Sequence, residues 1–309
     1  AGLALPRAAL AQNATPGAGP YGPLDDATAN ADGVIIPPGF TVRRIAASLE
    51  PVPGTDVEWH KFPDGAACFP TPDGGWNYVC NSEIFTPRGL GGVTAIQFDA
   101  EGTIVAARSI LSGTTGNCAG GPTPWGTWLS CEEDFASDRG QVYECDPTGA
   151  TEALPRPAMG FWAHEAVAVD PEGQQLYLTE DQPDGLLYRF TPAANPDLAE
   201  GLLEVALVAG DGSVSWAEVP DPSATSGPCR LQVAESTAFA GGEGIWYHDG
   251  VVYFCTKLDN VVHQLDVRTQ TYSVVHRAVP EDVAAGTAVL SGVDNITVDA
   301  GTGDLFVAE

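Results

Sequence analysis

One strand–turn–strand unit sets the pattern of the chain, and it reads Gly116-Asn-Cys-Ala-Gly-Gly-Pro-Thr-Pro-Trp-Gly-Thr-Trp-Leu-Ser-Cys-Glu-Glu-Asp-Phe135. The Gly- and Pro-rich centre predicts a tight turn, and an aromatic strand follows it. Cys118 opens the unit and three consecutive acids, Glu132 to Asp134, close it. A thiol beside carboxylates suits a transition metal next to a hard cation. The alternative is a solvated strand end with a buried structural cysteine.

The same unit recurs along the chain. Its first positions are Cys68, Cys118, Glu165, Glu243 and Asp294. A charged residue follows each of them 14 or 15 residues later, namely Glu83, Glu133, Glu180, Lys257 and Glu309. The steps between the first positions are 50, 47, 78 and 51 residues. A strand-only repeat near 50 residues is typical of β-propeller blades, so we predict an all-β propeller rather than a sandwich.

This repeat also predicts the domain organisation. We expect the propeller to cover residues 33–309, with a strand after the turn at Gly39 and an insertion at about 195–235 in the 78-residue step. The fifth repeat has no outer strands, so we expect the last part of the ring to be missing from this chain. We therefore expect the natural protein to continue past Glu309.

Propeller geometry predicts where the repeated residues meet. The first strand of each blade lines the central channel, and its hairpin partner returns to the same end. The candidate metal ligands at one mouth of this channel are Cys118, Glu133, Glu165, Glu180, Glu243, Asp294 and Glu309. Carboxylates that converge in this way repel one another, and bound cations relieve the repulsion.

Composition excludes some partners. The chain carries a net charge of −28, with 41 acidic and 13 basic residues. Such a surface repels nucleic acid and anionic lipid but attracts cations. No apolar run reaches the ~18 residues of a membrane helix, so we expect no membrane insertion.

The N-terminus suggests export, and export in turn bears on the cysteines. Residues 1–11 resemble the tail of a signal peptide, with small residues at Ala9 and Ala11, and residues 12–32 resemble an extended or disordered leader. We therefore expect a periplasmic or secreted protein. Seven cysteines in such a protein predict three disulfides and one free thiol, for which Cys118 is our candidate.

Several motifs together resemble one known family, the PhoX-type alkaline phosphatases. In chain order they are Asn117–Glu133, His164–Pro171, Tyr177–Asp181, Gly242–Gly244 with Val252–Lys257, and Gly292–Asn295 with Asp304–Glu309. The resemblance runs over about residues 34–309. Its most specific part is the block that leads from Cys118 to the acid pair ending at Glu133.

The resemblance implies an exported six-bladed propeller with a cluster of Fe³⁺ and Ca²⁺. It implies that Cys118 and Glu133 ligate iron and that Glu165 and Glu243 bind the cluster, these four forming the catalytic set. Asp294 and Glu309 then belong to the calcium side. Enzymes of this kind hydrolyse phosphate monoesters, and sometimes diesters, at alkaline pH. They usually leave the cytoplasm folded, by the twin-arginine route, and we expect a monomer that acts on small phosphate esters.

One position departs from the family pattern. The resemblance implies a phosphate-gripping Arg two residues before Glu243, where this chain has Gly241. A charge-assisted contact to an anion is worth about 1.5–3 kcal/mol, so we expect weakened or altered phosphatase activity. Arg88 and Arg139 are candidates to replace it.

Two other functions remain open on the sequence alone. A calcium-dependent hydrolase of the lactonase or gluconolactonase kind would use one calcium ion and would not need Cys118. A non-catalytic acidic propeller would bind cations or a partner protein without turnover.

Overall fold

The computed structural model describes residues 28–31, 33–87, 89–135 and 140–309. The predicted signal remnant at 1–11 and most of the leader at 12–32 lie outside these ranges, as do Arg88 and Arg139. No helix in the described part of the chain is long and apolar enough to cross a membrane.

Four antiparallel meanders make up most of the fold. The first sheet contains β1 (Pro63–Pro70), β2 (Trp76–Ser82), β3 (Gly91–Phe98) and β4 (Ile104–Thr114). The second contains β5 (Asn117–Pro122), β6 (Trp128–Glu132), β7 (Val142–Cys145) and β8 (Leu154–Pro155). The third contains β9 (His164–Asp170), β10 (Gln175–Glu180), β11 (Leu187–Ala194), β12 (Asp197–Val208) and β13 (Val214–Glu218). The fourth contains β14 (Gly242–His248), β15 (Val251–Thr256), β16 (Val261–Asp266) and β17 (Thr271–Arg277).

The remaining elements are short. A two-stranded sheet joins β18 (Ile296–Val298) to β19 (Leu305–Val307). The helical turns are η1 (Pro157–Met159), η2 (Cys229–Leu231) and α1 (Pro280–Ala285).

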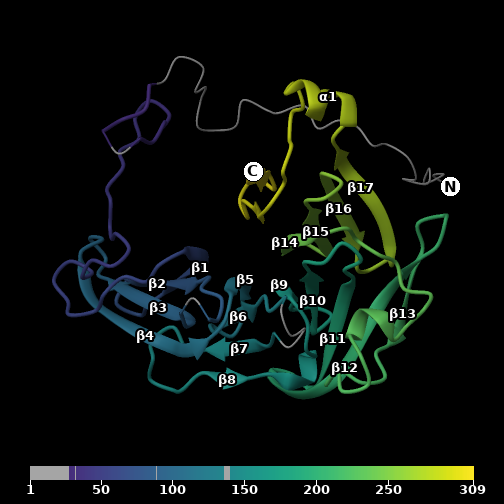
Figure 1. Ribbon diagram of the computed structural model, residues 1–309. Helices are drawn as coiled ribbons and strands as arrows, with labels where there is room; N and C mark the ends of the chain where they lie inside the picture. Colours follow the sequence, from purple (N-terminus) through teal and green to yellow (C-terminus); the bar gives the residue numbers. More distant parts are fainter. Residues whose placement is uncertain (1–27, 32, 88, 136–139) are drawn as a thin grey trace.

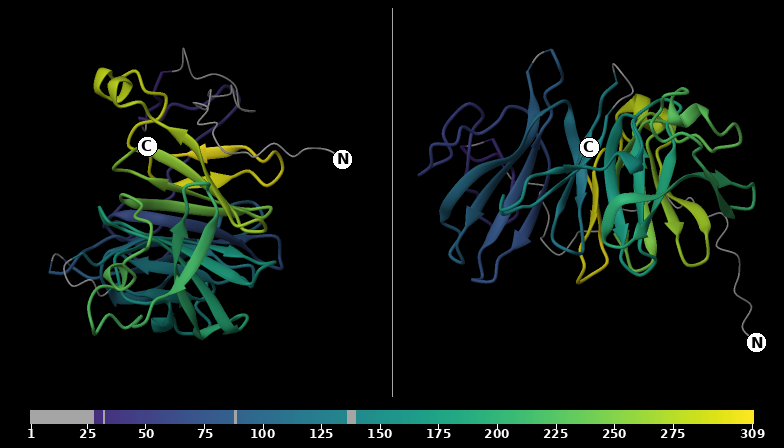
Figure 2. Two further views of the ribbon diagram at one scale, coloured as in Figure 1. Left: turned by 90° about the vertical axis from the view of Figure 1, so that its right-hand side faces the viewer. Right: turned by 90° about the horizontal axis from the view of Figure 1, so that it is seen from below.

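The sheets follow one another around a common axis, with their first strands innermost (Figure 1). β1, β5, β9 and β14 lie toward the middle of the arc, and the later strands of each sheet lie toward its outside. The two perpendicular views show successive sheets stacked face against face, as blades are in a propeller (Figure 2). The predicted all-β propeller is therefore confirmed.

Apolar side chains between the sheets hold the blades together. Trp128 and Val93 belong to a cluster between the first and second sheets, and Leu129 and Val167 to one between the second and third. Tyr177 and Phe254 belong to the cluster between the third and fourth. Fully burying one such side chain contributes about 1.5–3 kcal/mol. Because each of these three cores spans two blades, the inner strands of the four sheets are fixed relative to one another.

Three expectations need revision or detail. The turn at Gly39 is present, but no strand follows it before β1. The segment 195–235 contains β12 and β13, the outer strands of the third sheet, followed by a loop with η2. No disulfide joins any of the seven cysteines, so the prediction of three disulfides is wrong.

Candidate metal centre

A β-bulge occurs at the same place in all four large sheets. In each, two residues of the first strand face one residue of the second, as between Pro63 and Ala66 of β1 or between Gly242 and Ile245 of β14. The residues that enter these bulges are Asp64, Cys118, Glu165 and Glu243. A bulge re-aims a side chain relative to the regular pleat, which explains why these four turn toward the channel end.

Buried polar side chains of the second strands fix two of the bulges. Asn81 of β2 donates from Nδ2 to the carbonyl oxygens of Cys118 (2.9 Å) and Ala119 (2.8 Å). Its Oδ1 accepts from Trp128 Nε1 and Ser130 Oγ, each at 2.9 Å, so Asn81 is fully satisfied. Thr179 of β10 donates to the carbonyl of Glu243 at 2.6 Å. The bulge backbones are therefore held from the neighbouring blade.

Small residues follow the bulged ones because the inner strands pack closely. A Cβ added at Gly65 would lie 2.6 Å from the Cα of Ala119. A Cβ at Gly244 would lie 2.6 Å from the Cα of Asn295. Side chains at these positions would push the blades apart, and with them the groups that the bulges aim at each other.

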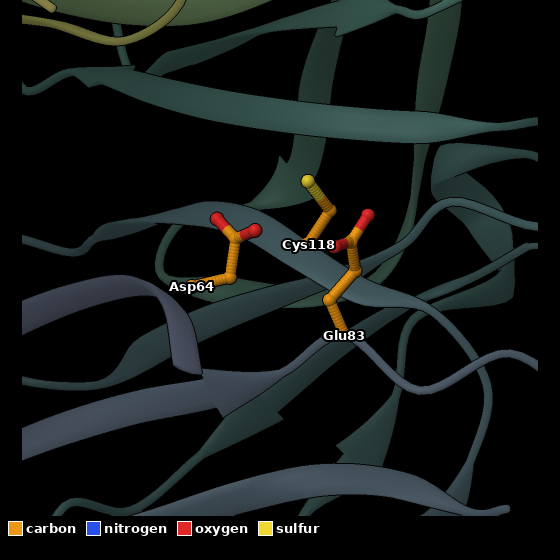
Figure 3. Close-up of side chains that lie close together, drawn as sticks. All are labelled: Asp64, Glu83 and Cys118. Carbon is orange, nitrogen blue, oxygen red and sulfur yellow. The ribbon is translucent and has the colours of Figure 1, made fainter. Parts of the chain in front are cut away.

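Three groups of potential metal ligands result, and neighbouring groups share members. Within each group the donor atoms all lie within 4.8 Å of one another. The groups are Asp64–Glu83–Cys118, Cys118–Glu133–Glu165 and Glu165–Glu243–Asp294. Cys118 links the first group to the second, and Glu165 links the second to the third. Figure 3 shows the first group, with the thiol and both carboxylates around one space.

Burial and like charge dominate the electrostatics of the groups. Glu133, Glu165 and Glu243 are between 3% and 4% exposed. Burial, and then the hydrogen bond and charge of Asp181, raise the pKa of Glu133 to about 10. Burial and then the charge of Glu133 raise the pKa of Glu165 well above its ordinary value. Without cations, these carboxylates retain protons that metal ions would displace.

Burial and neighbouring negative charge also raise the pKa of the Cys118 thiol. Cys118 Sγ lies 3.4 Å from Glu165 Oε1, and burial followed by that charge raises the pKa of the thiol well above its ordinary range. A thiolate at this position therefore requires a nearby cation, because metal coordination deprotonates a thiol.

One lysine enters this acidic region. Lys257 Nζ lies 2.6 Å from Asp181 Oδ2 and 2.6 Å from Glu243 Oε1. Burial raises the pKa of Glu243 to about 8 even though Lys257 lowers it. Glu243 Oε1 is buried and has no hydrogen bond beyond this charge contact.

Five of the seven predicted ligands come together in the second and third groups. They are Cys118, Glu133, Glu165, Glu243 and Asp294. The structure brings neither Glu180 nor Glu309 into a group. Glu180 instead accepts hydrogen bonds from Tyr188 Oη (2.8 Å) and Arg230 Nη1 (3.2 Å). The carboxylate of Glu309 accepts from the backbone N–H of Ser291.

Asp64 and Glu83 were not predicted as ligands from the sequence. Asp181, which lies beside the groups and pairs with Lys257, was not predicted as a site residue. Cys68 was taken as the first position of the first repeat, but it pairs with Tyr78 further along β1, and Asp64 is the residue in the bulge. The available signal was the small residue that follows each bulged position, Gly65 after Asp64 as Ala119 follows Cys118. The 15-residue spacing selected Glu180 instead of its neighbour Asp181. In the structure Glu180 pairs with His164 across the sheet.

Gly241 lies directly beside Lys257. It has a positive φ of 70°, and an added Cβ would lie 3.1 Å from Lys257 Cγ and 2.9 Å from Leu258 Cγ. A larger residue would therefore be strained and crowded here.

The donor sets fit cations of two kinds. The first two groups mix a thiol with carboxylates, as transition metals prefer, and the third contains only carboxylates, as calcium prefers. Among the residues that the structure describes, Lys257 is the one counter-charge that contacts Glu243 Oε1, and the pKa values of the buried acids Glu133 and Glu165 are raised, so the protein supplies little positive charge to these groups.

Solved structures resemble the fold at low sequence identity. A candidate phosphatase from Bacteroides thetaiotaomicron matches with a TM-score of 0.51 and 12% identity, over 79% of this chain and 58% of that one. An auxiliary nutrient binding protein from the same organism matches with a TM-score of 0.50 and 11% identity, over 79% of this chain and 56% of that one. The chain thus spans less than two thirds of either structure. At these identities the likeness concerns the fold alone.

Sequence comparison is more specific. No curated protein matches the chain. The family model described as alkaline phosphatase PhoX matches residues 89–291, which is more than half of the chain and includes the Cys118, Glu133, Glu165 and Glu243 positions. The resemblance that the motifs indicated is therefore confirmed. The chain belongs to the PhoX family of alkaline phosphatases.

Proposed function

We propose that this protein is a metal-dependent phosphatase that hydrolyses phosphate monoesters, and also diesters, at the channel end where the three ligand groups meet. The observation that carries this proposal is the sharing of ligands between groups. Because Cys118 and Glu165 each belong to two groups, cations bound there would lie side by side. Adjacent cations are what a phosphoryl group needs to have several of its oxygens held at once.

The proposed metals are Fe³⁺ and Ca²⁺. Iron would be held by Cys118, Glu133 and Glu165, where a thiol is available. Calcium would be held by Glu165, Glu243 and Asp294, which offer only oxygen. The donor sets and the family membership support this division.

When bound, these cations would polarise the phosphoryl oxygens and offset the charge that develops during displacement. The protein holds the ligands in place through the bulges and the Asn81 and Thr179 clamps, so little reorganisation is needed. Gly241 offers no side chain to a phosphate, so we propose that the cations make the main contacts to it.

The setting of this enzyme is also part of the proposal. We propose that it acts outside the cytoplasm, as a monomer, on small phosphate esters rather than on nucleic acid or in a membrane. The signal-like residues 1–11 and the net charge of −28 support this.

The test compares two cysteine variants of the purified protein. Cys118→Ala removes the shared thiol, whereas Cys68→Ala removes an exposed thiol outside the groups. Iron and calcium per chain are measured by elemental analysis, together with hydrolysis of a chromogenic phosphate monoester. We expect Cys118→Ala to lose iron and phosphatase activity and Cys68→Ala to keep both.

Iron content unchanged in Cys118→Ala would overturn the iron assignment. Calcium without iron, together with hydrolysis of a lactone, would favour the lactonase-like alternative. Bound metals without turnover of either ester class would leave a cation-binding propeller.

A further inference from the structure

The ligand groups repeat with a regular geometry around the channel. Each of the first two consists of a bulge residue, the residue just after the second strand of the same sheet, and the bulge residue of the next sheet. These are Asp64–Glu83–Cys118 and Cys118–Glu133–Glu165. By the same rule a third group would consist of Glu165, Asp181 and Glu243. The structure departs from the rule here, because the donor atoms that converge with Glu165 and Glu243 are those of Asp294.

The place between Asp181 and Glu243 already contains a cation from the protein itself. The ammonium of Lys257 contacts Asp181 and Glu243, each at 2.6 Å. Lys257 follows β15 directly, as Glu83 follows β2 and Glu133 follows β6. The fourth sheet thus offers a base where the first two offer acids.

The backbone leaves room for this lysine. A Cβ added at Gly241 would lie only 3.1 Å from Lys257 Cγ, so a side chain there would crowd the lysine stem. The Lys257 N–H donates to the Gly241 carbonyl at 2.9 Å, which fixes the start of the side chain. Gly241 has no side chain to block the lysine, and the backbone of Lys257 is hydrogen-bonded to Gly241. The ammonium of Lys257 can therefore contact Asp181 at the end of the third sheet.

We propose that Lys257 is a tethered counter-ion, which occupies the place between Asp181 and Glu243 that a divalent cation would otherwise take. The other positions then remain open to metal. This inference rests on the metal centre of the proposed function but not on its phosphatase chemistry.

A tethered ammonium differs from a metal ion in two ways. It brings one positive charge where calcium brings two, and no chelator can remove it. The Asp181–Glu243 pair should therefore stay compensated when metals are stripped, whereas the first two groups should not.

The first experiment counts bound cations. Lys257→Met keeps the apolar stem and removes the charge, and Lys61→Met is the matched control at the chain's other lysine, which is exposed. Each protein is stripped with chelator, equilibrated with calcium, and analysed for calcium per chain. We expect Lys257→Met to bind one more calcium ion than the wild type and Lys61→Met to match the wild type. Equal stoichiometry in a folded Lys257→Met protein would overturn the proposal.

A second measurement uses the wild type, so it does not depend on the folding of the variant. The two lysines are acetylated in chelator and in calcium, and their rates are compared by mass spectrometry with Lys61 as the internal reference. We expect Lys257 to react several-fold more slowly than Lys61 in both conditions. If calcium brings the rate of Lys257 up to that of Lys61, calcium has displaced the ammonium and the proposal fails. Neither experiment requires phosphatase turnover.

Discussion

Glu180 and Asp181 are neighbours in the sequence, yet the end of β10 sends them into opposite environments. Glu180 is completely buried, accepts hydrogen bonds from Tyr188, Arg230 and the Leu186 N–H, and has a pKa raised by burial only to about 7. Asp181 faces Glu133, whose pKa rises to about 10. Burial raises the pKa of both glutamates. The difference is that donors surround Glu180, whereas acids surround Glu133. The first region stabilises the fold by itself, whereas the second, in the described part of the chain, has only Lys257 as a counter-charge and requires further cations.

The largest effect is expected when Arg230, the charge partner of Glu180, is replaced. Arg230→Met leaves Glu180 buried without its charge partner, so we expect a loss of about 3–5 kcal/mol in the free energy of unfolding. The loss should be the same with and without metals, because Glu180 lies outside the ligand groups. Urea denaturation in calcium and in chelator measures this.

The control is the same change at Arg268, whose ion pairs with Glu172 and Asp249 are exposed. Arg268→Met should cost less than about 1 kcal/mol. If the two variants lost the same stability, the buried Glu180 pair would have no special role.

The next largest effect concerns pH in the metal-free protein. The pKa values of Glu133, about 10, and Glu243, about 8, are raised in the folded state, so the folded chain holds protons that the unfolded chain releases above about 4.5. This contribution to stability is therefore fully present below about pH 4.5, falls as the pH rises above that value, and is gone once the pH has passed the folded-state values of about 8 and 10. We expect a loss of several kcal/mol between pH 6 and 9, since each retained proton costs about 1.4 kcal/mol per pH unit.

Cations should remove this dependence, because a ligated carboxylate is ionised at every pH in that range. Denaturation midpoints at pH 6, 7.5 and 9 in chelator and in calcium check this. A flat profile in chelator would mean that the channel carboxylates are compensated by the protein alone.

The same comparison shows how far the sequence could lead. Spacing found Cys118, Glu165 and Glu243 because each opens the first strand of a blade, and the repeat length is a property of the blade. It could not separate Glu180 from Asp181, because side chains in a strand alternate and a shift by one residue reverses the face. Nor could it show the bulges, which add one residue to each first strand and made Cys68 a better match to the spacing than Asp64.

Glu309 was predicted as a ligand and lies outside the groups for a different reason. It has the expected distance in sequence from Asp294, but Asp294 lies outside β18 and the hairpin is short, so equal spacing does not give equal geometry. The fold followed from the repeat, whereas the ligand set depended on register that only the paired strands define.

The smallest effects give the sharpest test. The same Glu→Gln change is expected to alter the stability of the metal-free protein in opposite directions at Glu180 and at Glu133. Glu180→Gln should destabilise the metal-free protein by about 1–3 kcal/mol, since it weakens hydrogen bonds to a charged group. Glu133→Gln should stabilise the metal-free protein by about 1 kcal/mol at pH 8, since a neutral amide replaces an acid whose ionisation is suppressed by burial and by Asp181. Calcium and iron should reverse the second sign, because the amide is a weaker ligand, and leave the first unchanged. If both variants were destabilised equally in chelator, the channel acids would be structural like Glu180, and cations would not be needed to hold them together.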